Sequence, residues 1–134
     1  MCYLTDNRWG NSDVDDGTVE LLSPIFQVMP GPLSVSFDYF LGLVNENGQD
    51  RLTLEWSFSE SAGAPFTPWQ PLWRANLDSQ GGWRSVVLPW QALESLQVEG
   101  AQQVRLRFLA RDGYPPSVVE AGLDRILIGA SGCF

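Results

Sequence analysis

The chain has 134 residues, 44% of them hydrophobic, and carries a formal net charge of -8 from 16 acidic and 8 basic residues. A chain of this length can bury about two thirds of its unfolded surface, so we expect one domain over residues 1–134. Its acidic balance disfavours nucleic acid and anionic membranes as partners. The absence of histidine excludes the usual general base and the histidine-rich zinc sites.

The first predicted elements are a short strand over residues 2–5 and a polar loop that ends in crowded carboxylates. Asp13, Asp15 and Asp16 stand within four residues of one another. They repel one another in a small loop unless a cation lies between them. Gly17 then releases the backbone into an extended segment. The sequence therefore predicts an acidic metal loop that leads into the first long strand.

Alternation of apolar and polar residues with period two predicts half-buried strands in the next part of the chain. The predicted strands are Thr18–Leu22, Leu33–Tyr39, Arg51–Phe58 and Gln103–Ala110. In the third of them Trp56 alternates in phase with leucines, which is typical of a core residue.

The other elements are less regular. Trp69–Arg74 contains Pro71, which confines this segment to an edge strand or an irregular stretch. Trp83–Leu88 is a further predicted strand, and 89–94 is the only plausible helix. The last segment, 118–128, is long enough for a strand with a bend near Gly122. Seven or eight short strands with almost no helix predict a two-sheet antiparallel β-sandwich.

Segments from Cys2 to Gly129 also carry a resemblance to a known family. They are Cys2-Tyr3-Leu4-Thr5, Asp13-Val14-Asp15 with Gly17, Leu21 with Ser23-Pro24, Leu52-Thr53-Leu54-Glu55, Gly82-Trp83, Val104 to Phe108 with Asp112, and Ser117 to Ala121 with Leu123-Asp124. In order and spacing they resemble the bacterial jelly-roll domains of secreted, immune-inhibitor-type peptidases. They are also similar to MAM domains and to the cleaved adhesin domains of gingipain-like proteins. The resemblance implies a non-catalytic jelly-roll sandwich with a structural calcium, on a secreted or cell-surface protein.

The family pattern suggests that Asp124, on the last strand, approaches the acidic loop. The predicted calcium ligands are therefore Asp13, Asp15, Asp16 and Asp124. The alternative is a solvated acidic turn whose carboxylates cap backbone N–H groups. The chain departs from the family at Arg125, where the family tends to have a second acid.

Six tryptophans are many for this length, and aromatic faces are surfaces on which sugar rings stack. In an extended segment Trp69 and Trp73 would share a face about 13 Å apart, a spacing that suits separated sugar units. We therefore predict them as ligand-binding residues. The alternative is that they pack against the protein or cover a sheet edge.

These observations favour a non-catalytic, calcium-stabilised extracellular module for binding or adhesion, with glycan or protein as ligand. One alternative is a purely structural accessory domain of a secreted peptidase, with no ligand of its own. Another is a small carboxylate-based glycoside hydrolase that uses Glu20, Glu55 or Glu120.

The ends of the chain bear on where the protein works. The sequence has no run of about 18 apolar residues and no signal-peptide pattern at its start. We therefore expect no membrane insertion, and a secreted parent that has lost its signal or a domain cut from a longer chain.

Cys2 and Cys133 could form a disulfide if the first and last strands are neighbours; the alternative is two unrelated thiols.

Overall fold

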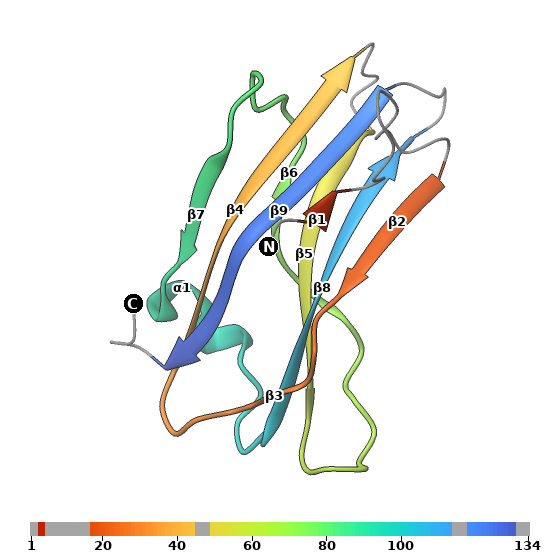
Figure 1. The fold of residues 1–134 in the computed structure, drawn as a ribbon. Helices are drawn as coiled ribbons and strands as arrows, with labels where there is room; N and C mark the ends of the chain where they lie inside the picture. The colour runs from red at the N-terminus through yellow and green to blue at the C-terminus, as the bar shows by residue number, and fades with distance from the viewer. Residues whose placement is uncertain (1–2, 5–16, 45–48, 114–117, 131–134) are drawn as a thin grey trace.

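The computed structural model describes residues 3–4, 17–44, 49–113 and 118–130, and its strands form two stacked sheets (Figure 1). The four-stranded sheet has the order β1-β9-β4-β7, and the five-stranded sheet has the order β2-β8-β5-β6, with β3 also paired to β8. The first sheet contains β1 (Tyr3–Leu4), β9 (Val118–Ala130), β4 (Leu33–Val44) and β7 (Arg84–Leu88). The second contains β2 (Gly17–Leu22), β8 (Gln103–Asp112), β5 (Arg51–Ser59), β6 (Gln70–Ala75) and β3 (Phe26–Gln27).

The predicted all-β fold, a two-sheet antiparallel jelly-roll sandwich, is confirmed. All the described strand pairs are antiparallel. A one-turn helix, α1 (Trp90–Leu93), continues into the 3-10 helix η1 (Glu94–Leu96), at the segment where the sequence predicted the helix. Among the described residues, no helix has the length and hydrophobicity needed to cross a bilayer.

The core lies between the two sheets because each long strand points alternate side chains inward. Leu54 and Trp56 of β5 are fully buried, as their alternation predicted. Phe37 of β4 meets Phe108 of β8 across the core, edge to face, with ring centroids 5.2 Å apart. Such aromatic contacts stabilise the packing of the two sheets beyond the contribution of the apolar area that they bury.

The last strand is irregular at Arg125, and not near Gly122 as the sequence predicted. The register between β4 and β9 shifts between Ser36 and Asp38. Arg125 has a φ of 49°, a left-handed backbone conformation that accompanies β-bulges. The bulge directs the Arg125 side chain to the carboxylate of Asp38.

The first and last strands are neighbours, with Tyr3 paired to Leu123. This is the condition under which we predicted a disulfide between Cys2 and Cys133. Both cysteines lie outside the described residues, so the disulfide stays a prediction.

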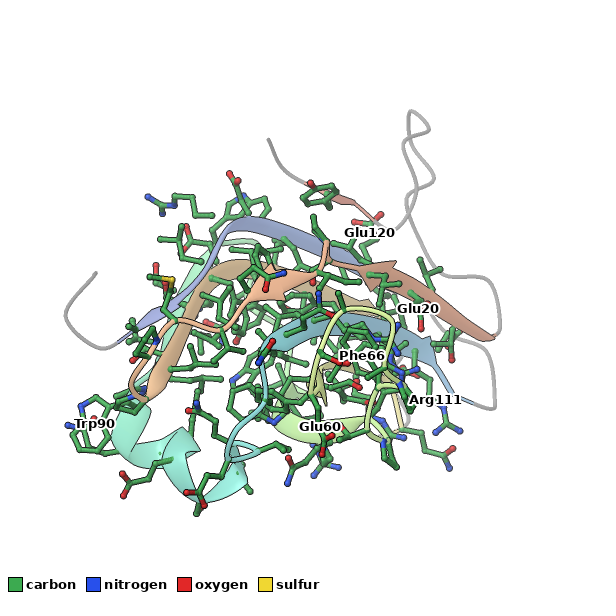
Figure 2. The ribbon with its side chains drawn as sticks, turned by 90° about the horizontal axis from the view of Figure 1, so that it is seen from below. Glu20, Glu60, Phe66, Trp90, Arg111 and Glu120 are labelled. Carbon is green, nitrogen blue, oxygen red and sulfur yellow. The ribbon has the colours of Figure 1, made fainter. Side chains whose placement is uncertain are left out.

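The outer face of the five-stranded sheet is not covered by the helix. Figure 2 places Trp90 of α1 at the opposite side of the molecule from Arg111. The outward residues of β5, such as Thr53 and Glu55, alternate with its buried leucines and remain partly exposed. This sheet face is therefore open to solvent between its loops.

Candidate functional site

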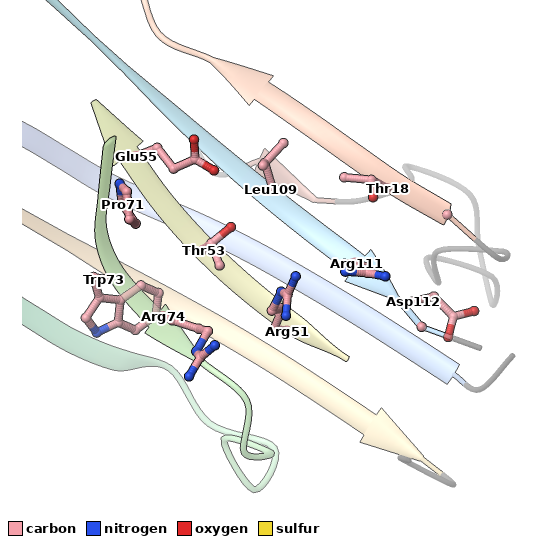
Figure 3. Close-up of a pocket in the computed structure, with 12 residues that line it drawn as sticks. Thr18, Arg51, Thr53, Glu55, Pro71, Trp73, Arg74, Leu109, Arg111 and Asp112 are labelled. Carbon is pink, nitrogen blue, oxygen red and sulfur yellow. The ribbon is translucent and has the colours of Figure 1, made fainter. Parts of the chain in front are cut away.

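An open groove of about 760 Å³ lies over the outer face of the five-stranded sheet (Figure 3). Its floor is formed by outward side chains of three adjacent strands. These are Thr18 of β2, Leu109 and Arg111 of β8, and Arg51, Thr53 and Glu55 of β5. Pro71, Trp73 and Arg74 of the edge strand β6 border it on one side. Guanidinium, hydroxyl and apolar groups thus line a single elongated surface.

The strand register explains which side chains meet in the groove. Arg111 pairs with Thr18 on one side and with Arg51 on the other. In the next outward-facing row, Thr53 lies between Leu109 and Arg74. Arginines from β8, β5 and β6 therefore converge on the same end of the groove, as Figure 3 shows.

Glu55, at the other end of the groove, and Glu20 of β2 are bound to one arginine. Arg107 Nη2 lies 2.6 Å from Glu55 Oε2, and Arg107 Nη1 lies 3.3 Å from Glu20 Oε2. The third carboxylate considered for a hydrolase, Glu120, belongs to β9 in the opposite sheet. Glu20 and Glu55 are therefore engaged in ion pairs with a shared arginine, and Glu120 lies in the other sheet.

Trp69 lies on this outer face, against two arginines. The guanidinium carbons of Arg105 and Arg107 are 4.7 and 4.4 Å from its ring centroids. Arg105 also stacks on Phe66, at 4.1 Å. Arg107 thus combines this contact with its ion pairs, whereas Arg105 is held by aromatic rings.

Trp73 points into the core, so the prediction that it shares a face with Trp69 is wrong. Its ring meets Phe37 and Tyr39 of the other sheet edge to face, with centroid distances of 4.9 Å in both cases. The cause is a register shift between β5 and β6. Trp73 pairs with Leu54, and Pro71, two residues earlier in β6, pairs with Glu55, only one residue later in β5. One extra residue in a strand moves every following side chain to the opposite face. A role for either tryptophan in ligand binding stays a prediction.

Three of the four predicted calcium ligands, Asp13, Asp15 and Asp16, lie outside the described residues. The fourth, Asp124, is paired with Asp38 in the four-stranded sheet, and its Oδ1 accepts a hydrogen bond from the backbone N–H of Arg125 at 2.8 Å. Within the part of the chain that the structure describes, no three acidic or other metal-binding side chains form a cluster that could hold a metal. The calcium site therefore stays a prediction.

The register of β2 and β8 indicates a further carboxylate that the sequence did not suggest as a calcium ligand. Gly17, the residue after the acidic run, pairs with Asp112 of β8. Asp124 instead borders the opposite end of β2, beside Leu22 and Pro24. Asp112 is thus closer than Asp124, along the β2 pairing, to the point where the acidic run enters the sheet. The sequence holds Asp112 among the family-like segments but gives no sign of this pairing.

Asp38 forms a separate polar centre in the four-stranded sheet. Ser85 Oγ donates a 2.7 Å hydrogen bond to Asp38 Oδ1, and Arg125 binds its other oxygen. The Ser85 hydrogen bond, followed by the Arg125 contact, lowers the pKa of the Asp38 carboxyl below its ordinary value. Arg125 therefore acts as the partner of a buried carboxylate on a sheet that does not form the groove.

Comparison with known proteins identifies the fold. No protein-family model matches the sequence, and no curated protein matches it. Among solved structures, the chain is similar to the carbohydrate-binding module TmCBM61 in complex with β-1,4-galactotriose, with a TM-score of 0.52 and 12% identity over 97% of this chain and 82% of that one. It is also similar to the CBM22-1–GH10 modules of endo-1,4-β-D-xylanase 10B from Clostridium thermocellum, complexed with xylohexaose. There the TM-score is 0.48 and the identity 16%, over 99% of this chain and 25% of that one.

At 12% identity the first comparison establishes the fold alone. The chain has a β-sandwich of the kind found in carbohydrate-binding modules. The finer resemblance, to jelly-roll domains of secreted peptidases, stays a prediction.

Proposed function

We propose that this domain is a non-catalytic module that binds a glycan chain in the groove of the five-stranded sheet. The observation that carries the proposal is the groove itself, an open volume of about 760 Å³ lined by polar and apolar side chains on a sheet face that α1 does not cover. A groove open along a sheet can hold several units of a linear polymer, whereas an enclosed pocket holds one small molecule.

The chemistry of the groove suits a sugar chain. Glycan hydroxyls both donate and accept hydrogen bonds, and Thr18 and Thr53 can do the same, while the arginines donate. Leu109 and Pro71 supply apolar surface for the C–H faces of sugar rings. Trp69, on the same side of the sheet, adds an aromatic surface of the type on which such rings stack. The groove therefore offers both polar and apolar contacts, as a carbohydrate does.

The comparison supports the same proposal from another side. The solved structure with this fold at a TM-score of 0.52 is a carbohydrate-binding module in complex with an oligosaccharide. By analogy, we propose an extracellular module of a larger chain, on a secreted or cell-surface protein. The groove carboxylate Glu55 is held in an ion pair by Arg107, which supports a binding role over a hydrolytic one.

A groove-filling variant tests the proposal. Thr53→Tyr places a large side chain on the groove floor, and Ser36→Tyr makes a comparable change on the outer face of the four-stranded sheet, as its matched control. Affinity electrophoresis and calorimetry on a panel of soluble polysaccharides give the dissociation constants. We expect Thr53→Tyr to weaken binding at least about tenfold, a loss of about 1.4 kcal/mol, and Ser36→Tyr to leave it unchanged.

The same assay tests glycan binding against the alternatives. A structural accessory domain would bind no polysaccharide in the wild type, and a protein-binding module would give the same result. A hydrolase would release reducing ends from the polysaccharide during incubation. Equal losses of affinity in both tyrosine variants would indicate that the ligand does not bind in the groove. Circular dichroism confirms that each variant is folded before binding is compared.

A further inference from the structure

The positive charge of this acidic protein is gathered on one face. The described residues contain seven arginines, and five of them lie on the outer face of the five-stranded sheet. The five are Arg51, Arg74, Arg105, Arg107 and Arg111. The other two, Arg84 and Arg125, belong to the four-stranded sheet. A chain with a net charge of -8 thus presents a locally cationic surface at the groove.

Glutamates offset only part of this charge. Glu20 and Glu55, which the strands present on the same face, are both bound by Arg107. Asp112 borders the groove but is 3% exposed. Among the described residues, no carboxylate forms an ion pair with Arg51, Arg74 or Arg111.

The arrangement of these three arginines, which we call the arginine triad, is unfavourable for the folded protein alone. Arg51 and Arg111 are direct cross-strand partners, and like charges in directly opposite positions destabilise a sheet. Arg74 pairs with Thr53, two residues along β5 from Arg51, so it lies on the diagonal about 7–8 Å away. Arg74 and Arg111 are exposed, and Arg51 is half-buried. A ligand that carries negative charge would relieve this repulsion.

We propose that the groove selects an anionic glycan, one that carries carboxylate or sulfate groups, and that the arginine triad binds those groups. This inference rests on the proposed glycan-binding function and names its ligand class. The guanidinium group is planar and offers paired N–H donors, which match the two oxygens of a carboxylate or sulfate. Three such groups from neighbouring strands can bind acidic substituents on successive parts of one chain.

The net charge of the molecule does not oppose this proposal. Screening limits the reach of a surface charge to about 8 Å at physiological ionic strength, so the potential in the groove depends on the nearby arginines. The overall negative charge still repels polyanions that cover a wide surface, such as nucleic acid. A single glycan chain contacts the groove and little else.

Polysaccharides with matched backbones test the inference. Dextran, carboxymethyl-dextran and dextran sulfate share one backbone and differ in charge, and the two charged forms distinguish carboxylate from sulfate as the preferred group. Polygalacturonate and its methyl ester form a second pair. We expect the wild type to bind at least one charged form about tenfold or more tightly than its neutral counterpart, with affinity that falls as salt rises.

Charge-removing variants assign that preference to the triad. R51Q/R111Q removes two groove charges, and Arg84→Gln removes one from the exposed surface of the other sheet. We expect R51Q/R111Q to abolish the preference for the charged form and Arg84→Gln to retain it. Circular dichroism and thermal melting check that the double variant is folded. If it is not, the single variant Arg74→Gln, at an exposed position, replaces it and is expected to reduce the preference.

The outcomes separate this inference from the proposed function. Tight binding to neutral polysaccharides that Thr53→Tyr abolishes, without preference for charged forms, overturns the inference and leaves glycan binding intact. No binding to any polysaccharide overturns both. Equal effects of R51Q/R111Q and Arg84→Gln, or equally tight binding of single-stranded DNA, would indicate a general attraction for polyanions and overturn the inference.

Discussion

Arg51 and Arg111 stand directly opposite each other on β5 and β8, at the floor of the groove. Two positive charges in this position oppose folding, and sites that bind ligands often retain such unfavourable contacts. We predict that Arg111→Thr raises the free energy of unfolding by about 0.5 kcal/mol, because it removes the repulsion and keeps a residue that favours strands. The gain should shrink in high salt.

Urea unfolding at low and high salt measures this effect. Arg84→Thr, an exposed change on the edge strand β7, controls for the strand preference of threonine. A gain in Arg84→Thr as large as that in Arg111→Thr would mean that repulsion within the groove is not the cause.

The two tryptophans that the sequence grouped together should differ in their contribution to stability. Trp73 contacts Phe37 and Tyr39 across the core, so Trp73→Ala should lower the free energy of unfolding by about 3 kcal/mol. Trp69→Ala removes contacts with two arginines on the outer face and should cost about 1 kcal/mol. Chemical denaturation measures both, and Trp73→Phe should recover part of the loss. A larger cost for Trp69→Ala would contradict the assignment of Trp73 to the core.

The same contrast decides which tryptophan can test ligand stacking. Because Trp73→Ala perturbs the core, a loss of binding in that variant would not identify a contact with the ligand. Trp69→Ala should stay folded, and we predict that it weakens glycan binding several-fold if the indole contacts the sugar. Titration of the folded variant against the tightest-binding polysaccharide measures this. Unchanged affinity would exclude Trp69 from the binding surface.

The Asp38 centre predicts a loss of stability in acid. Its pKa is lowered in the folded state by the Ser85 hydrogen bond and by Arg125, so its stabilising contribution is complete above the unfolded-state pKa of about 3.9 and is lost as the pH falls through the lower, folded-state value. Asp38→Asn should therefore lower the melting temperature at neutral pH and narrow its difference from the wild type below about pH 4. Melting curves at a series of pH values measure this. A difference that is constant with pH would contradict the argument.

Calcium should stabilise the protein if the acidic run binds it, because a ligand that binds only the folded state raises its stability. After treatment with a chelator, millimolar calcium should raise the melting temperature of the wild type, and Asp15→Asn should reduce that rise. Asp124→Asn tests the ligand that the family pattern suggests. Asp112→Asn tests the carboxylate of the residue that pairs with Gly17, directly after the acidic run. No rise in the wild type would contradict the calcium prediction.

The sequence by itself determined where the strands are and which side chains they bury. Its period-two alternation is a local property, and it predicted the long strands and the burial of Trp56. Pro71 indicated an edge or irregular segment, because proline has no N–H for a central strand, and β6 lies at the sheet edge. From these elements the antiparallel sandwich followed, because strands with one apolar face must pack that face against another sheet.

The tertiary structure alone decided how the strands lie beside one another, and the site depends on that. The bulge in β6 separates Trp69 from Trp73, and the pairing of β5 with β8 brings Arg51 opposite Arg111. Register and bulges arise from the packing of segments far apart in the chain, and a shift of one residue reverses the face of every side chain that follows. The overall charge could not predict the cationic groove. The arginines of the triad come from β5, β6 and β8, and they meet on one face only when these three strands are paired.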